Sequence, residues 1–209
     1  IPPMPFLPSP SNTMRLVILA AVLTTIGSST LTAQAGARRA APSTRAATTV
    51  ELTFADTAAQ RAAGKPALVR IDYGQPHLRG RTINSENLVP YDQVWRLGAN
   101  AATLLTTEAE LTIGGTNVPA GRYIMQVLPT RNSWTLILQR ETSGAAQVML
   151  GQYDAGKDFA RIPLRLSTLS VPVESFSIWL VPSTAPGAQT GLLTMAWGTV
   201  QLQADWAVR

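Results

Sequence analysis

The stretch from Gly80 to Trp134 decides the fold class of this chain of 209 residues. Its centre is Val89-Pro-Tyr-Asp-Gln-Val-Trp-Arg-Leu-Gly-Ala-Asn100, and turn-forming groups follow at Gly114-Gly-Thr-Asn117 and Pro119-Ala-Gly121. Glycine and asparagine accept positive φ angles and proline presets φ in a turn, so such groups favour short strands joined by tight turns. The stretch therefore predicts a β-rich domain.

Apolar residues recur with a period of two around this stretch. Apolar and polar side chains alternate over residues 50–54 and again over residues 69–73, which is typical of strands with one buried face. We expect further strands at residues 102–107, 108–113, 122–128, 133–138, 161–169, 176–181, 192–197 and 199–206, and a short helix or a loop at residues 56–65. Many short strands without a long helix indicate a β-sandwich or a barrel. We predict an all-β, antiparallel β-sandwich of the jelly-roll or Ig-like type over residues 49–209.

One helical turn is expected inside the central stretch, between Leu88 and Leu97. Pro90 suits the first turn of a helix, and Gly98 suits the position just after its end. The turn would lie between two strands.

The N-terminal segment has the pattern of a secretory signal. Met14-Arg15 precedes an apolar run, and Ala33-Gln-Ala35 supplies a small-residue cleavage site. The membrane-facing residues would be Leu16, Val17, Ile18, Leu19, Val22, Leu23 and Ile26. Residues 1–35 are thus predicted to be either a cleaved signal peptide or a retained apolar helix that anchors the chain in the inner membrane. Both alternatives place the folded domain in the periplasm.

Positive charge is concentrated before residue 50. The net charge is +5, and removing Arg15, Arg38, Arg39 and Arg45 leaves +1 for the remainder, since no acid precedes residue 50. A nucleic-acid-binding domain carries its basic face on the domain itself, so nucleic acid is not an expected partner. Residues 36–48 are predicted to be a basic, flexible arm in which Arg38, Arg39 and Arg45 contact a protein partner. The absence of Cys excludes disulfides and thiolate chemistry.

The most site-like residues lie in the central stretch. Trp95, Arg96, Asn100 and Arg81 would form a weak ligand-binding cluster, because Arg binds carboxylates bidentately and an Asn amide offers both a donor and an acceptor. The structural alternative is that Trp95 fills the core and Arg96 pairs with Asp72 or Asp92. We favour this structural alternative.

Catalytic, metal-binding and cofactor-binding residues are not expected. His77 is the only histidine. In the sequence, no serine lies near both His77 and an acidic residue, as a catalytic triad would suggest. Two acidic pairs could act as metal ligands: Glu108 with Glu110, better explained as a solvated strand edge, and Asp154 with Asp158, a Ca²⁺ loop that would need further oxygen ligands from elsewhere. A sugar-stacking platform of Trp134, Trp179, Trp197 and Trp206 is less probable than burial of these residues in the core.

The central motifs resemble a bacterial envelope family known as domain-of-unknown-function family 2911. The similarity rests on Gly80-Arg-Thr-Ile83, Val89 to Asn100 with Ala102-Thr103, Ile113-Gly-Gly115, Pro119-Ala-Gly-Arg-Tyr123, Trp134-Thr135 and the closing Leu193-Thr-Met-Ala-Trp197. One departure is Leu150, where the family pattern implies Trp. The resemblance covers roughly residues 50–205 and implies a secreted β-sandwich with no established reaction.

Three functions follow from these patterns. The first is a non-enzymatic periplasmic domain that acts through protein contacts, as an accessory or bracing subunit of a membrane-associated complex, with an energy-transducing complex as one host. The alternative is a periplasmic module that binds a carbohydrate or a small anion through Trp and Arg on one sheet face. The third and least favoured is a hydrolase that uses Asp and His77.

Overall fold

The computed structural model describes residues 39–209 with the exception of residue 86. The chain divides into two units, and the second, Ala41–Arg209, contains every described helix and strand. These elements are β1 (Thr44–Leu52), α2 (Thr57–Ala63), β2 (Ala67–Gln75), β3 (Thr103–Thr107), β4 (Leu111–Ile113), β5 (Thr116–Val118), β6 (Gly121–Pro129), β7 (Trp134–Arg140), the 3₁₀ helix η2 (Ala155–Lys157), β8 (Asp158–Pro182) and β9 (Thr190–Val208).

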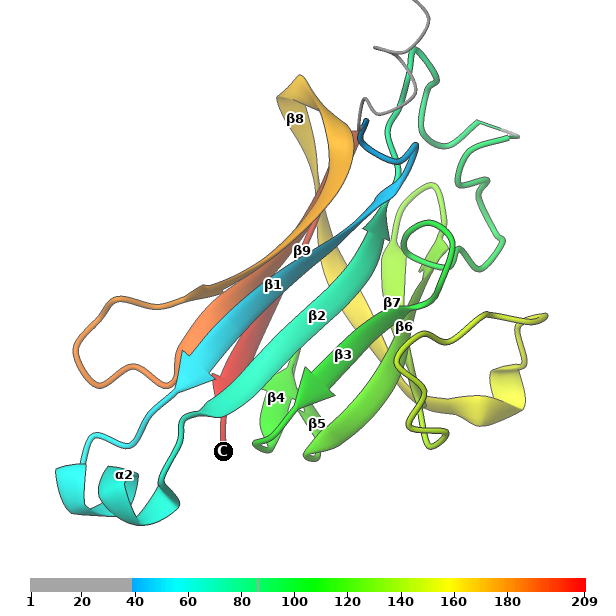
Figure 1. Ribbon diagram of the computed structural model, residues 1–209. Coiled ribbons are helices and arrows are strands. Elements are labelled where there is room, and N and C mark those ends of the chain that lie inside the picture. The colour runs from blue at the N-terminus through cyan, green and yellow to red at the C-terminus, as the bar shows by residue number, and fades with distance from the viewer. Residues whose placement is uncertain (1–38, 86) are drawn as a thin grey trace, which may run out of the picture. The chain divides into compact units, whose positions relative to one another are not determined.

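The strands form one antiparallel sheet of nine strands in the order β1-β2-β3-β6-β7-β8-β9-β4-β5 (Figure 1). The all-β prediction is therefore confirmed. The two layers expected of a sandwich belong to one continuous sheet. They are joined by β8, which pairs with β7 through residues 158–164 and with β9 through residues 165–182.

The two longest strands fold back on themselves. In β9 the amide of Val208 donates to the carbonyl of Gln189 at 2.8 Å, and the Gln203 side chain donates to Thr194 Oγ1 at 3.2 Å. The bend lies at Gly198, whose φ angle of 57° favours glycine. The register of β8 against β9 shifts between Thr168 and Ser177, and Figure 1 shows β8 folding over in this region. Four predicted strands thus become two bent ones.

Side chains of β1 and β2 connect to the second half of β8. The amide of Ile178 donates to the Tyr73 hydroxyl at 3.1 Å, and the amide of Leu180 donates to Thr48 Oγ1 at 3.2 Å. Burial raises the pKa of Tyr73, so its hydroxyl stays protonated at neutral pH. These bonds give the amides of Ile178 and Leu180 a hydrogen-bond partner on β2 and β1.

The core lies inside the curved sheet. Its largest fully buried side chains include Trp134, Tyr123 and Phe176, and Trp197 and Trp206 are buried with them. The interpretation of Trp134, Trp197 and Trp206 as core residues is confirmed, and only Trp179 of the suggested platform is exposed.

Three local predictions differ from the structure. Residues 44–48 belong to β1 and pair with β2, so the flexible-arm prediction is wrong for this part of residues 36–48. No helical turn forms in residues 88–97; positive φ angles at Val89, Asp92 and Leu97 are incompatible with one. Thr116 and Asn117, predicted as a turn, belong to the short strand β5.

The predictions for residues 1–35, for Arg38 and for the N-terminal apolar helix lie outside the described residues. In residues 39–85 and 87–209, none of the helices has the length and apolar character needed to cross a membrane.

Candidate functional site

The predicted ligand-binding cluster does not assemble into a site. Trp95 pairs with Val127 of β6 through backbone hydrogen bonds of 2.8 and 2.9 Å. Its indole stacks on Trp197 with ring centroids 5.6 Å apart and meets Phe176 edge-on at 5.2 Å. Trp95 therefore packs against the core, as the structural alternative predicted.

The other three predicted ligand-binding residues serve local backbone. Arg96 is exposed and donates to the carbonyl of Asn100 at 3.3 Å; no ion pair to Asp72 or Asp92 forms, so that part of the structural alternative is wrong. Asn100 donates to the carbonyl of Ser43 at 3.4 Å. Arg81 donates to the carbonyls of Leu78 and His77, at 3.0 and 2.8 Å. The side chains of Arg81, Arg96 and Asn100 therefore stabilise the local backbone.

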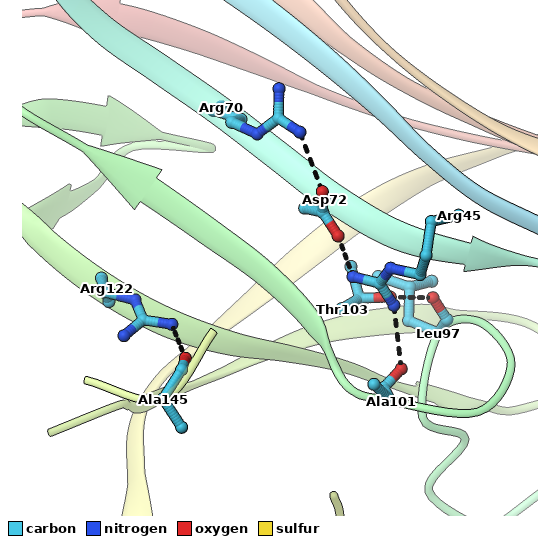
Figure 2. Close-up of polar contacts among 8 residues, drawn as sticks. All are labelled: Arg45, Arg70, Asp72, Leu97, Ala101, Thr103, Arg122 and Ala145. Carbon is cyan, nitrogen blue, oxygen red and sulfur yellow. Dashed lines mark hydrogen bonds and ion pairs between the residues drawn. The ribbon is translucent and has the colours of Figure 1, made fainter. Parts of the chain in front are cut away.

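Arg45, predicted to contact a partner, is engaged within the sheet (Figure 2). Its guanidinium pairs with the Asp72 carboxylate and donates to the carbonyl of Ala101 at 3.4 Å. Arg70 binds the other carboxylate oxygen of Asp72 at 2.9 Å. Arg39 is exposed. Arg45 thus joins β1, β2 and the loop before β3.

Close packing against the central motif explains Gly74 of β2, and a hydrogen bond within the motif explains its threonine. The buried hydroxyl of Thr103 donates to the Leu97 carbonyl at 2.6 Å, as Figure 2 shows. A Cβ atom on Gly74 would lie 1.8 Å from the carbonyl oxygen of Ala99, so only glycine fits there. The motif therefore specifies the fold.

A cavity of about 500 Å³ lies between the outer face of β6 and β7 and residues 148–157. Its floor includes Gln126 of β6 and Gln139 of β7, which are only 5% and 7% exposed. Gln139 is held by bonds from Nε2 to the Asp154 carbonyl (2.8 Å) and to Asp158 Oδ1 (2.9 Å). The Gln126 amide is not one of the buried polar atoms that lack a hydrogen-bond partner in the described part of the chain, so the cavity holds no unsatisfied amide there.

A network of three side chains fixes the segment over this cavity. Asp158 Oδ2 accepts from the Tyr153 hydroxyl at 2.6 Å and from Arg161 Nε at 2.8 Å. Burial by itself would raise the pKa of Asp158, but hydrogen bonds from Tyr153, Gln139 and Arg161 outweigh it and hold that pKa below its usual range. Burial, followed by the Asp158 carboxylate, raises the pKa of Tyr153. The network therefore keeps Asp158 ionised and Tyr153 protonated at neutral pH.

Residues 141–147 lead into this segment and are tied to β6. Arg122 donates to the carbonyl of Ala145 at 2.6 Å (Figure 2) and pairs with the Glu141 carboxylate at 2.9 Å. Hydrogen bonds from Ser143 lower the pKa of Glu141, with Arg122 adding to the effect. The amide of Ala102 also donates to the Val148 carbonyl at 2.7 Å. The cover of the cavity is therefore attached at several points.

Arg140 borders the same cavity at the end of β7, but its side chain lies on the face of its cross-strand partner Tyr123, opposite to the face of Gln126. Its guanidinium carbon is 4.3 Å from the ring centre of Phe159 and 5.5 Å from that of Tyr123, and Nη1 donates to the Tyr123 hydroxyl at 3.3 Å. Among the described residues, no carboxylate lies within ion-pair distance of Arg140. Glutamine and arginine beside apolar strand residues were the available sequence signal for this cavity, and sequence reasoning missed it.

A second feature is a set of exposed apolar side chains along β8. Six large apolar side chains are exposed in the described part of the chain, and four lie on β8: Leu166, Val171, Trp179 and Val181. Trp179 and Val181 are 42% and 50% exposed. Val181 also lines a shallow groove of about 600 Å³ with Pro182, Leu192 and Trp206.

His77 does have a serine neighbour. Its Nδ1 lies 2.7 Å from Ser175 Oγ, a pairing that the sequence did not reveal because 98 positions separate the two residues. Neither residue lines the two cavities described above. The pair joins the end of β2 to β8.

The acidic pairs considered as metal ligands make protein contacts. Glu108 pairs with Lys65 at 3.0 Å and accepts from the Leu68 amide, and these bonds lower its pKa. Glu110 pairs with Arg209 at 3.6 Å. Asp154 caps η2, accepting from the Gly156 amide at 2.9 Å. Outside residues 1–38 and 86, the structure contains no group of three or more potential metal ligands.

Fold and contacts together define an all-β domain with a covered polar cavity on one outer face and an apolar patch on another. The family model described as protein of unknown function DUF2911 matches residues 54–205, and the chain belongs to this family. This membership confirms the resemblance seen in the sequence. No curated protein and no solved structure matches the chain.

Proposed function

We propose that this domain is a non-enzymatic, periplasmic accessory subunit that binds a protein of a membrane-associated complex. The observation that carries the proposal is the concentration of exposed apolar side chains on β8, in particular Trp179 and Val181. Exposed tryptophan beside other apolar side chains is characteristic of protein interfaces.

The groove beside Val181 suits a side chain from such a partner. It is lined by carbon atoms of Pro182, Leu192 and Trp206, and Asp205 stands at its border in a bidentate ion pair with Arg165 (2.5 and 2.9 Å). An apolar anchor in a groove with a polar rim is the usual arrangement of an interface hot spot. The expected partner surface is therefore apolar at its centre.

A pair of matched variants tests this proposal in cells that naturally produce the protein. Replacing Trp179 and Val181 with Ser should abolish co-migration with a larger complex on native gels after mild detergent extraction. The control is Val171→Ser, which removes an equally apolar side chain from the bend of β8. Wild-type protein that migrates as a free monomer beginning at Gly36 would contradict the proposal.

A second candidate function is binding of a carbohydrate or a small anion. The sheet face with Trp and Arg that first suggested it is not formed, since Trp95 packs inward and Arg96 lies on a loop. The cavity over β6 and β7 favours the same function at another place, because the polar side chains of Gln126 and Gln139 line a space of about 500 Å³ there. Perturbation of the Gln126 side-chain NMR signal by added sugars or anions tests this candidate.

A further inference from the structure

We propose that a hollow at the ends of β1 and β9 binds an uncharged, mostly apolar molecule that carries a carbonyl oxygen, with the indole N–H of Trp206 as its hydrogen-bond donor. This β1–β9 hollow lies between the end of β1, the loop that joins β8 to β9, and the end of β9. Figure 1 shows the ends of β1 and β9 beside the start of β2. The inference goes beyond the accessory function and does not depend on it.

The walls of the β1–β9 hollow are mainly apolar. Val50, Leu52 and Phe54 line one side, and Pro182 and Val208 line the other. The volume of about 570 Å³ is in the size range of small-molecule sites, which are also mainly apolar. A bound apolar molecule would therefore remove carbon surface of this hollow from water, which is favourable.

Phe54 is the exposed part of this wall. Its side chain is 60% exposed, although it follows directly on a strand whose Val50 is buried in the core. The amide of Phe54 donates to Gln60 Oε1 of α2 at 3.0 Å, and Asp56 caps α2 by accepting from the Ala59 amide at 2.7 Å. The backbone that carries the exposed ring is thus held by local hydrogen bonds.

Trp206 brings an unpaired donor to the hollow. Its side chain is only 3% exposed, and it lines both the β1–β9 hollow and the adjoining groove beside Val181. In residues 39–85 and 87–209, Trp206 Nε1 is one of the few buried side-chain polar atoms without a hydrogen-bond partner. A buried indole N–H normally has one, because an unpaired donor loses its bond to water without replacement.

The position of this N–H follows from its neighbour Gly191. A Cβ atom on Gly191 would lie 2.4 Å from Cε2 of Trp206, the ring carbon that is bonded to Nε1. The N–H group therefore lies beside the start of β9, where Thr190 and Pro182 line the hollow and the groove alike. An acceptor that enters on an apolar molecule would give this N–H the partner that the described residues do not supply.

The charges at the hollow favour an uncharged ligand. Of the described residues that line it, only Arg209 is cationic, and its Nη1 lies 3.6 Å from the Glu110 carboxylate. Glu51 adds a negative charge at the border. An indole N–H only donates, so it requires an acceptor. A carbonyl oxygen accepts without bringing either a charge or a further donor that would itself need a partner.

Titration of the full-length protein, with its tryptophans labelled with ¹⁵N, tests the inference with two matched probes. Acetophenone and ethylbenzene have nearly the same size, and only acetophenone has a carbonyl oxygen. Both should bind, and acetophenone should bind roughly threefold to tenfold more tightly, as expected for one additional hydrogen bond. Only acetophenone should move the Trp206 indole proton signal downfield. The signal of Trp179, which lies outside the hollow, should stay unchanged.

Two variants with the same substitution assign the preference to one indole. Trp206→Phe keeps an aromatic ring and removes the N–H, so the affinity for acetophenone should fall to that for ethylbenzene. Trp179→Phe is the matched control outside the hollow and should retain the preference. Phe54→Ser should weaken the binding of both probes and leave their ratio unchanged, because it removes only apolar wall.

The wild-type protein alone gives the decisive outcomes. Equal affinities for the two probes would overturn the role of the indole N–H, and so would an unchanged Trp206 signal at saturating acetophenone. Absence of binding by either probe would overturn the site itself. These readouts do not require a variant, so the test remains decisive if Trp206→Phe fails to fold.

Discussion

Two outer faces of the same sheet differ in polarity and in exposure to solvent. Over β6 and β7 the face carries Gln126 and Gln139, and residues 148–157 cover it. Over β8 the face carries Trp179 and Val181, and these side chains remain in contact with solvent. In most antiparallel sandwiches the outer face is polar and the buried face is apolar. Here the polar face is covered and the apolar one is exposed, and each reversal coincides with a proposed binding role.

The largest expected effect concerns the groove under the apolar face. A Cβ atom on Gly191 would lie 2.4 Å from ring carbons of Trp206 and 2.5 Å from the Val181 carbonyl oxygen. Gly191→Ala should therefore displace the buried indole and lower the free energy of unfolding by about 3 kcal/mol. Urea denaturation followed by tryptophan fluorescence measures the change. Gly151→Ala, with no atom within 4 Å of the new carbon, serves as the control. Equal stability of the two variants would show that Trp206 adapts freely.

A smaller loss is expected from the network that holds the cover of the cavity. Asp158→Asn removes the ionised carboxylate that accepts hydrogen bonds from Tyr153, Gln139 and Arg161. It should destabilise the domain by about 1–3 kcal/mol. Proteolysis within residues 141–157 should become faster at the same time. Asp154→Asn, at an exposed cap of η2, should have less effect on both measurements. If the apolar face of β8 became protease-sensitive instead, the two faces would not be independent.

Acid should destabilise the covered face through protonation of Asp158. The pKa of Asp158 is lower in the folded than in the unfolded state, so its contribution to stability is complete above the unfolded value. That contribution is lost as pH falls from the unfolded pKa, about 3.9 for Asp, through the folded one. Urea midpoints measured across this acid range should therefore fall more steeply for wild type than for Asp158→Asn. Parallel curves would contradict this assignment.

The smallest effect is expected on the apolar face itself. Val181→Thr keeps the shape of the side chain and adds a hydroxyl that water can solvate, so stability should change by less than about 0.5 kcal/mol. Val127→Thr places the same hydroxyl in the core and should cost about 1–3 kcal/mol. Thermal denaturation of both variants measures the contrast. A large loss from Val181→Thr would indicate that this side chain supports the fold and is not held for a partner.

Sequence patterns determined the class of the fold because they are local. Alternation at residues 50–54 and 69–73 follows directly from the opposite directions of successive side chains in a strand. The structural interpretation of Trp95 also follows from its type and neighbours. The predictions were wrong where contacts between residues that are distant in the sequence decide the local structure. Arg45 is held in β1 because Asp72 of the neighbouring strand, two residues from its cross-strand partner Gly74, binds its guanidinium. Residues 88–97 avoid a helix because Asp92 and Trp95 pair with β6.

The sequence by itself determined that this chain forms a β-rich domain of family DUF2911, since periodicity and turn residues lie next to one another along the chain. Only the tertiary structure decided which residues cover the outer face of β6 and β7, which arginines pair with carboxylates and which tryptophan stays exposed. Each of these properties depends on contacts between segments that are distant in the sequence. The bends of β8 and β9 and the cover formed by residues 148–157 create those contacts, and no local pattern specifies them.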